Sequence, residues 1–219
     1  MNGFPKRIFL IDDHPIVRKG MVELIASDSR FEICGEASSW SEAMSAVVPS
    51  SPDAVILDIS LGERMGLDLI GEMLSLVPSL RILVLSMHDE MVFAERALRA
   101  GAHGYVMKVA ASQKVLEALQ CVLSGGIYVS ESLQAKILGR LLHSREPQRP
   151  SGFESLSNRE LEILTLIGQG LSTDGIAERL HLSAKTIEVH RSRIRMKLNL
   201  GPEDRLVEVA IRIRNGLAQ

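Results

Sequence analysis

Short apolar runs typical of β-strands alternate with helix-like stretches through the first 125 residues. Nearly continuous apolar runs such as AVIL at 54–57 and ILVL at 82–85 predict strands that are buried on both faces. Five strand–helix units in strict alternation predict an α/β domain, a doubly wound parallel sheet with helices on both sides. The predicted strands are Arg7–Ile11, Glu32–Ala37, Ala54–Leu57, Ile82–Leu85 and Gly104–Met107. The predicted helices are Ile16–Ala26, Trp40–Val48, Leu67–Leu76, Val92–Ala100 and Lys114–Leu123.

The remainder of the chain changes character. Residues 126–152 are expected to be a linker with one amphipathic helix from about Glu131, followed by the Pro- and Ser-containing stretch SREPQRPSG. Residues 153–219 are expected to be all-helical, because Ser157, Ser172 and Ser183 each stand where a helix N-cap is needed. The three helices that these serines open are followed by a fourth over about 203–215. We therefore predict a first domain over 1–125, a second over 153–219, and a boundary near residue 147.

Composition separates these parts further. The whole chain carries 25 Lys and Arg against 27 Asp and Glu, a net charge of −2. Residues 1–125 hold 11 of the cations and 16 of the acids, whereas residues 185–197 hold five cations and one acid. The two cysteines, Cys34 and Cys121, are too few for a disulfide framework or a zinc cluster. No signal peptide or membrane span is evident, so a cytoplasmic protein without membrane contact is expected.

Three acids follow predicted strands of the first domain: Asp12 and Asp13 after the first strand, and Asp58 after the third. Parallel strands bring their carboxyl ends to one edge, where such sheets bind ligands. Three carboxylates together repel unless a cation binds, and oxygen ligands suit Mg²⁺. Lys108 and Ser86 end at the same edge and could hold a phosphoryl group. A single Asp there is more often a cap or turn former, and Asp13 could cap the following helix.

The segments LIDDHPIVRKGM, VILDISLGERMGLDLI, ILVLSMHDE and GAHGYVMK occur in this order and resemble a response-regulator receiver domain. The resemblance implies a flavodoxin-like fold and makes Asp58 the phosphoacceptor. Mg²⁺ would be bound by Asp12, Asp13, Asp58 and the backbone carbonyl of Ser60. It also implies that Lys108 pairs with the phosphoryl oxygens, and that Ser86 and Tyr105 form the switch pair.

Two features of this region leave questions open. Many receivers have proline after the lysine, but Val109 follows Lys108 here, and the sequence leaves that peptide bond cis or trans. An aromatic residue at the end of a strand, such as Tyr105, often belongs to the hydrophobic core. Without the receiver motif, a core role and a functional role for Tyr105 would be about equally expected.

The second domain contains a predicted helix-turn-helix. The helix capped by Ser172 is followed by a break at His181-Leu182 and by a longer helix from Ser183 to Leu198. In that longer helix Ile187, Ile194 and Leu198 form a buried stripe, together with Leu182 just before it. A basic outer face can enter a major groove of DNA, although a charged helix face is more often simply solvated. The side chains expected to point largely outward are Lys185, Glu188, Val189, Ser192, Arg193 and Arg195.

The stretch LSNRELEILTLIGQGLSTDGIAERLHLSAKTIEVHRSRIRMKL resembles the LuxR-type DNA-binding domain of NarL/FixJ regulators. The resemblance implies contacts with DNA at Lys185, Thr186, Glu188, Val189, His190, Ser192 and Arg193. His190 is equally consistent with internal packing. Relatives often carry Asn, a basic residue and Glu or Gln where this chain has Thr173-Asp174-Gly175. That departure puts DNA affinity, or the start of the second helix, in doubt.

Together the two resemblances imply a phosphorylation-dependent transcription regulator rather than an enzyme. Its implied partners are a sensor histidine kinase, double-stranded promoter DNA and a second copy of the chain when phosphorylated, with RNA polymerase as a further candidate. Leu206, Val207, Ala210 and Ile211 are candidates for self-association or for packing within the domain. Alternatives are a phosphohydrolase using Asp58, a receiver that only binds a partner protein, and an acyl-homoserine-lactone sensor. The phosphohydrolase is disfavoured because Ser60 stands where such enzymes usually have a second acid. The partner-binding receiver is disfavoured because the acids, Ser86 and Lys108 are all present. The lactone sensor is disfavoured because the first domain is an acidic α/β domain.

Overall fold

The computed structural model describes residues 4–61, 64–143, 152–201 and 205–214, and the chain divides into two compact units. The first unit extends to Ser130 and the second begins at Glu131. This division lies beyond residue 125, where the sequence ends the first domain, and before residue 147, where the sequence sets the boundary. The predicted flexible stretch at 144–151 lies outside the described residues.

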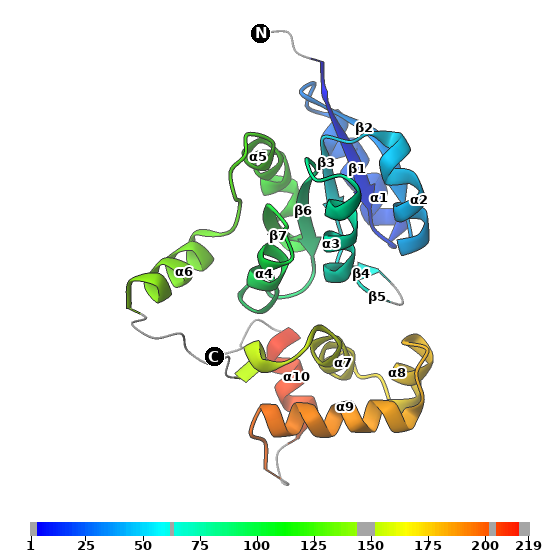
Figure 1. The fold of residues 1–219 in the computed structure, drawn as a ribbon, viewed down its shortest axis with the longest axis vertical. Coiled ribbons are helices and arrows are strands. Elements are labelled where there is room, and N and C mark those ends of the chain that lie inside the picture. Colours follow the sequence, from blue (N-terminus) through cyan, green and yellow to red (C-terminus); the bar gives the residue numbers. More distant parts are fainter. Residues whose placement is uncertain (1–3, 62–63, 144–151, 202–204, 215–219) are drawn as a thin grey trace. The chain divides into compact units, whose positions relative to one another are not determined.

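The first unit is built on a five-stranded sheet in the order β2-β1-β3-β6-β7, as predicted for a doubly wound domain (Figure 1). All neighbouring strands run parallel. Because the strand order reverses at β1, the loops after β1 and β3 open side by side at the carboxyl edge. The strands are β1 (Lys6–Ile11), β2 (Phe31–Ala37), β3 (Ala54–Leu57), β6 (Arg81–Ser86) and β7 (Gly104–Met107).

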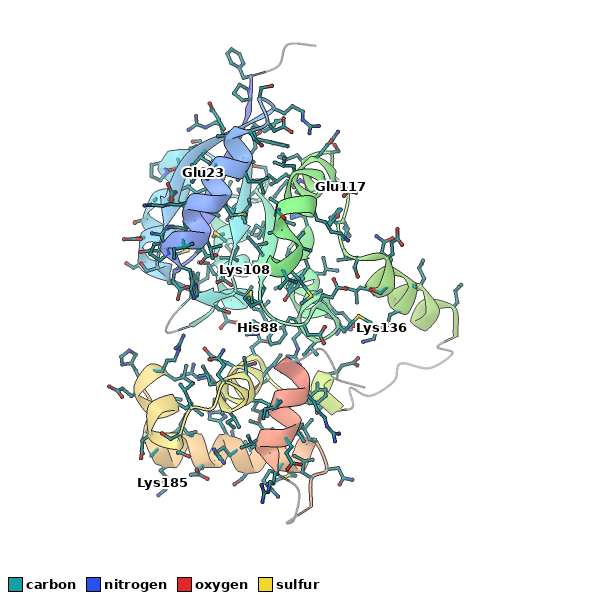
Figure 2. The ribbon with its side chains drawn as sticks, turned by 180° about the vertical axis from the view of Figure 1, so that it is seen from behind. Glu23, His88, Lys108, Glu117, Lys136 and Lys185 are labelled. Atoms are coloured by element: carbon teal, nitrogen blue, oxygen red, sulfur yellow. The ribbon has the colours of Figure 1, made fainter. Side chains whose placement is uncertain are left out.

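Five helices cover the two faces of this sheet. Figure 1 shows α3 in front of the strands, and Figure 2, seen from behind, shows α1 and α5 with Glu23 and Glu117. On the α1 and α5 face, Ile8, Leu10 and Ile56 pack with Ile25 and Val115, and all are fully buried. The predicted helices are therefore confirmed, with small shifts of their ends. They are α1 (Pro15–Ala26), α2 (Trp40–Ser50), α3 (Gly66–Leu76), α4 (Glu90–Arg99) and α5 (Ala111–Leu123).

Two small elements at the carboxyl edge were not predicted. A short antiparallel pair joins β4 (Ser60–Leu61) to β5 (Arg64–Met65), and a 3₁₀ turn, η1, spans Lys108–Ala110. Strands of two residues carry no readable alternation, so periodicity could not reveal them. The described residues contain no cis peptide bond, so the Lys108–Val109 bond is trans.

The segment after α5 explains why the first unit reaches Ser130. Tyr128 lies beside β7, where its carbonyl accepts a hydrogen bond from the amide of Tyr105 at 2.8 Å. The amide of Tyr128 donates to the carbonyl of His103 at 3.0 Å. Gly104 permits this approach, because a Cβ there would lie 3.0 Å from the Tyr128 carbonyl oxygen and 2.9 Å from Leu83.

The second unit is helical, as predicted. The helix expected from about Glu131 is α6 (Glu131–His143), and a 3₁₀ turn, η2 (Gly152–Ser155), precedes the others. Helix α7 packs against α9 and α10, and α8 packs against α9. The predicted fourth helix is observed over the described part, while residues 203, 204 and 215 lie outside it. The four helices are α7 (Asn158–Gly168), α8 (Thr173–Arg179), α9 (Ala184–Lys197) and α10 (Leu206–Arg214).

Serine side chains begin three of these helices, as the sequence predicts. Ser157 accepts from the amide of Glu160 while the Glu160 carboxylate accepts from the amide of Ser157, a complete capping box. Ser172 accepts from the amide of Gly175 at 3.1 Å, and Ser183 accepts from the amide of Thr186 at 3.1 Å. The second helix therefore begins after its serine even though Gly175 removes the reciprocal half of a capping box.

Candidate functional site

The three predicted acids meet at the carboxyl edge of the sheet. Asp12 and Asp58 are each 1% exposed, and Asp13 beside them is partly buried. One ligand atom from each of these acids and one from His14 all lie within 4.8 Å of one another. His14 was not singled out from the sequence. Its ring Nδ1 lies 2.6 Å from Asp13 Oδ1 and 3.3 Å from Asp12 Oδ1.

Lys108 neutralises part of this cluster. Its Nζ lies 2.7 Å from Asp12 Oδ2 and 2.7 Å from Asp58 Oδ2, with 8% of the side chain exposed. Burial by itself would lower the pKa of Lys108, but the carboxylates of Asp58 and Asp12 outweigh it and raise that pKa. Burial raises the pKa of Asp58 despite the opposing effect of Lys108. Lys108 therefore keeps its proton and its positive charge. A further cation beside Asp58 would stabilise the ionised form of its buried carboxyl group.

The loop after β3 holds Asp58 in place from the other side. The amide of Ser60 donates to Asp58 Oδ1 at 3.0 Å. Gly66, at the start of α3, comes so close that a Cβ there would lie 2.8 Å from the Asp58 carbonyl oxygen and 2.7 Å from Ile59 Cα. The β4–β5 pair thus folds back onto the acid, and glycine is required at its exit.

The predicted switch pair is joined by a residue that the sequence reasoning missed. Ser86 is completely buried and its Oγ accepts from the amide of His88 at 3.0 Å. The hydroxyl of Tyr105, which is 1% exposed, donates to the carbonyl of His88 at 2.9 Å. Burial raises the pKa of Tyr105, so the phenol keeps its proton. Tyr105 thus lies in the core, and its hydroxyl also reaches the loop that follows Ser86.

The side chain of His88 continues this network toward the acids. Its Nε2 lies 2.8 Å from the hydroxyl oxygen of Ser60, and its ring stacks on Phe93 with centroids 4.5 Å apart. Burial, helped by Lys108, lowers the pKa of His88 to about 4. The ring is therefore neutral near pH 7. Its place two residues after Ser86 is the only signal that sequence could have offered.

In the second unit, helix α9 carries the predicted DNA-facing residues. Ile187 and Ile194 are fully buried as predicted, whereas Leu198 and Leu182 are only partly buried. Lys185, Ser192 and Arg193 are exposed, and Val189 is 44% exposed. Thr186 is half-buried and shares a 2.8 Å hydrogen bond with Ser183. Glu188 is exposed and accepts from the hydroxyl of Thr173 at 2.8 Å.

Several cations of α9 serve the domain itself. Lys197 pairs with Glu160, a buried acid of α7, at 2.7 Å. Arg195 is only partly exposed and donates to the carbonyl of Gly201, so its prediction as an outward-facing side chain was wrong. Cationic side chains near the C-terminus of a helix can bond the carbonyl groups there. Arg191 lies 3.5 Å from Glu188. Lys185 and Arg193 have no ion pair or hydrogen bond within the described residues, so their charges are available to a partner.

The sequence leaves two interpretations of His190, a contact with DNA and packing inside the domain. Its ring is partly buried, and Nδ1 has no hydrogen-bond partner among the described residues. Burial lowers the pKa of His190 even though Glu160 opposes the shift, so the ring is neutral.

Each half of the chain matches a known protein family. Residues 8–120 match the family described as "Response regulator receiver domain", and residues 154–210 match "Bacterial regulatory proteins, luxR family". The chain is 35% identical over 211 residues to the oxygen regulatory protein NreC of Staphylococcus haemolyticus, covering 94% of this chain and 97% of NreC. It is 34% identical over 194 residues to the transcriptional activator DevR/DosR of Mycobacterium tuberculosis, covering 89% and 88%.

A solved structure is similar to this chain over most of its length. RcsB of Salmonella enterica serovar Typhimurium, bound to promoter rprA in the presence of a phosphomimetic, matches with a TM-score of 0.69 and 25% identity. That match covers 94% of this chain and 98% of RcsB. No helix among the described residues is long and apolar enough to cross a membrane.

A receiver domain followed by a helix-turn-helix domain defines a two-component response regulator. This chain belongs to the NarL/FixJ family of response regulators, with a LuxR-type DNA-binding domain, and is a transcription regulator.

Proposed function

We propose that Asp58 is the phosphoacceptor of this regulator. Its carboxylate would attack the phosphorus of a phosphohistidine on a sensor histidine kinase. A new P–O bond forms to Asp58, the P–N bond breaks, and the kinase imidazole leaves with the electron pair. The observation that carries the proposal is the buried carboxylate of Asp58, held at 2.7 Å from Lys108 and 3.0 Å from the amide of Ser60.

The acid cluster fits a magnesium ion. Three carboxylates and the ammonium of Lys108 leave an excess of negative charge, and the ligand atoms lie close enough to share one cation. Asp12, Asp13, Asp58 and the carbonyl of Ser60 would hold Mg²⁺, which supplies charge neutralisation for an incoming phosphoryl group. Lys108 is already directed at Asp58 and would pair with a phosphoryl oxygen.

Phosphorylation would then act through Ser86 and Tyr105. A phosphoryl group brings negative charge and new acceptor oxygens, which attract the Ser86 hydroxyl and the Lys108 ammonium. Ser86 ends β6 and Lys108 follows β7, so both lie at the carboxyl edge of the sheet. Movement of these two side chains would change the surface around β6, α4 and β7.

In the second unit, the exposed face of α9 would read promoter DNA. Lys185 and Arg193 would contact phosphates, while Thr186, Glu188, Val189 and Ser192 lie on or beside the face that meets base edges. His190 would contribute by packing. Since its ligand is the chromosome, the protein would act in the cytoplasm, and RNA polymerase is a candidate partner at the promoter.

A homodimer would form on phosphorylation. Of the four apolar candidates on α10, Leu206 and Ala210 are 4% and 1% exposed and pack inside the unit. Val207 and Ile211 are 43% and 36% exposed and are the ones that could meet a second copy. Acetyl phosphate with Mg²⁺ should raise the dimer fraction in sedimentation, and an unchanged monomer would contradict this part of the proposal.

The acceptor is tested with acetyl phosphate and Mg²⁺. Wild type and the control Asp28→Asn, which replaces an acid that lies outside the cluster and pairs with Arg30, should take up one acid-labile phosphoryl group per chain, whereas Asp58→Asn should take up none. Label that persists in Asp58→Asn would overturn the assignment. Continuous release of many phosphates per chain would instead favour the phosphohydrolase alternative.

A further inference from the structure

His88 occupies the junction between the phosphoacceptor loop and both switch residues. Its side chain contacts Ser60, two residues after Asp58, while its backbone amide and carbonyl bind Ser86 and Tyr105. A residue that meets all three through separate atoms can make their positions interdependent. Stacking on the fully buried Phe93 fixes the ring, and the next residue, Asp89, caps α4 through the amide of Met91 at 2.9 Å.

The hydrogen-bond directions indicate what this junction prepares. A serine hydroxyl has one proton and two acceptor positions. Because Ser86 Oγ accepts from the amide of His88, its own proton points to another acceptor, which is the Tyr105 hydroxyl oxygen in this structure and would be a phosphoryl oxygen at a loaded Asp58. The His88 carbonyl accepts the only proton of the Tyr105 hydroxyl and so holds the ring inward. The backbone of His88 thus orients both switch groups.

The side chain determines where that backbone lies. The neutral imidazole has one ring nitrogen that donates and one that accepts, and Nε2 is committed to Ser60. Ser60 is in turn fixed to Asp58 through its amide. The hydrogen bond between His88 and Ser60 therefore ties the position of the switch backbone to that of the acceptor carboxylate.

We propose that His88 is a positioning residue that couples phosphoryl binding at Asp58 to the Ser86 and Tyr105 switch through its ring contact with Ser60. The inference rests on the proposed function of Asp58. Without the ring contact, Phe93 and the two backbone bonds still hold residue 88, but its position is no longer tied to the loop that carries Asp58. Ser86 and Tyr105 are then poorly oriented when the phosphoryl group arrives.

The test uses full-length protein with beryllofluoride and Mg²⁺ as the phosphoryl probe. Ser60→Ala removes the hydroxyl but keeps the backbone of residue 60, and His88→Phe keeps an aromatic ring for stacking but removes Nε2. Each should weaken beryllofluoride binding about two- to tenfold, the range expected for one hydrogen bond. The double variant should be no weaker than either single variant, because both remove the same bond.

Two further measurements separate coupling from packing. The NMR signal of the Tyr105 ring should respond to beryllofluoride fully in wild type and only partly in His88→Phe. His88→Gln, whose amide can take the place of Nε2, should restore the response. Met87→Ala is the matched control, since Met87 precedes His88 and is 61% exposed.

Losses that add in the double variant, or unchanged binding and an unchanged Tyr105 response in the single variants, would overturn the coupling role. Failure of wild-type protein to bind beryllofluoride would instead count against Asp58 as the acceptor.

Discussion

The ammonium of Lys108 lies 2.7 Å from Asp58 Oδ2, so the proposed acceptor already has a cationic partner before any phosphoryl group arrives. The same Nζ is equally close to Asp12. One buried ammonium therefore restrains two carboxylates that would otherwise repel each other at close range.

Replacement of Lys108 by Met should expose that repulsion. We expect the receiver to lose about 3 kcal/mol of stability near pH 7 in metal-free buffer, because Asp12 and Asp58 are left buried without their cation. Millimolar Mg²⁺, or a fall in pH that protonates a carboxyl, should recover much of this loss. Urea unfolding with and without Mg²⁺ measures it. A loss that neither Mg²⁺ nor acid reduces would indicate a packing effect of the lysine stem.

His88 should make stability depend on pH. Its pKa is lowered to about 4 in the folded protein from 6.5, so the unfolded chain binds a proton more readily. Its contribution is complete above pH 6.5 and is lost as the pH falls toward 4. Relative to His88→Gln, wild type should lose about 2 kcal/mol of stability between pH 7.5 and pH 5. His103 and His190 titrate in both proteins, so the difference isolates His88. Parallel curves for the two proteins would contradict the prediction.

Two cations of α9 should differ in their effect on DNA binding. Arg193→Ala removes a charge without an internal partner among the described residues, so it should weaken binding and reduce the slope of affinity against salt by about one. Lys197→Met should leave that slope unchanged but destabilise the domain, because Glu160 is 3% exposed and loses its partner. Fluorescence titrations over a range of salt, paired with thermal unfolding, distinguish the two. Equal slopes for wild type and Arg193→Ala would remove Arg193 from the interface.

Gly175 should be a site where stability can be gained. It lies inside α8, and a Cβ there would meet only the Ser172 hydroxyl oxygen, at an ordinary 3.4 Å. Gly175→Ala should therefore stabilise the domain by up to about 1 kcal/mol. Gly168→Ala is the matched control and should destabilise, because its Cβ would lie 2.7 Å from the carbonyl oxygen of Ala210. Chemical denaturation of the two variants checks both signs.

Sequence predicted what depends on local pattern and on topology. Alternation predicts all five strands of the parallel sheet, and the rule that ligands bind at its carboxyl edge places Asp12, Asp58 and Lys108 together, as the structure shows. The serine caps of the second unit were predicted equally well, because a cap is a contact over three residues.

Contacts between distant residues could not be predicted in this way. The bond between Ser60 and His88 joins residues 28 apart, and the pairing of Tyr128 with β7 depends on how α5 ends. The carbonyl that attracts Arg195 lies beyond the end of its helix. The first two contacts are set by tertiary structure, which has no local signature in the chain, and the third depends on how the chain turns after α9.

The pairing of Tyr128 with β7 has a consequence for aggregation. β7 is an outer strand of the sheet, and such strands can recruit a foreign strand through their unpaired amides and carbonyls. The backbone of Tyr128 bonds the carbonyl of His103 and the amide of Tyr105. The segment that follows α5 therefore covers part of the outer edge of β7. A receiver truncated before residue 127 would leave those groups uncovered and would be more prone to form fibrils or swapped assemblies.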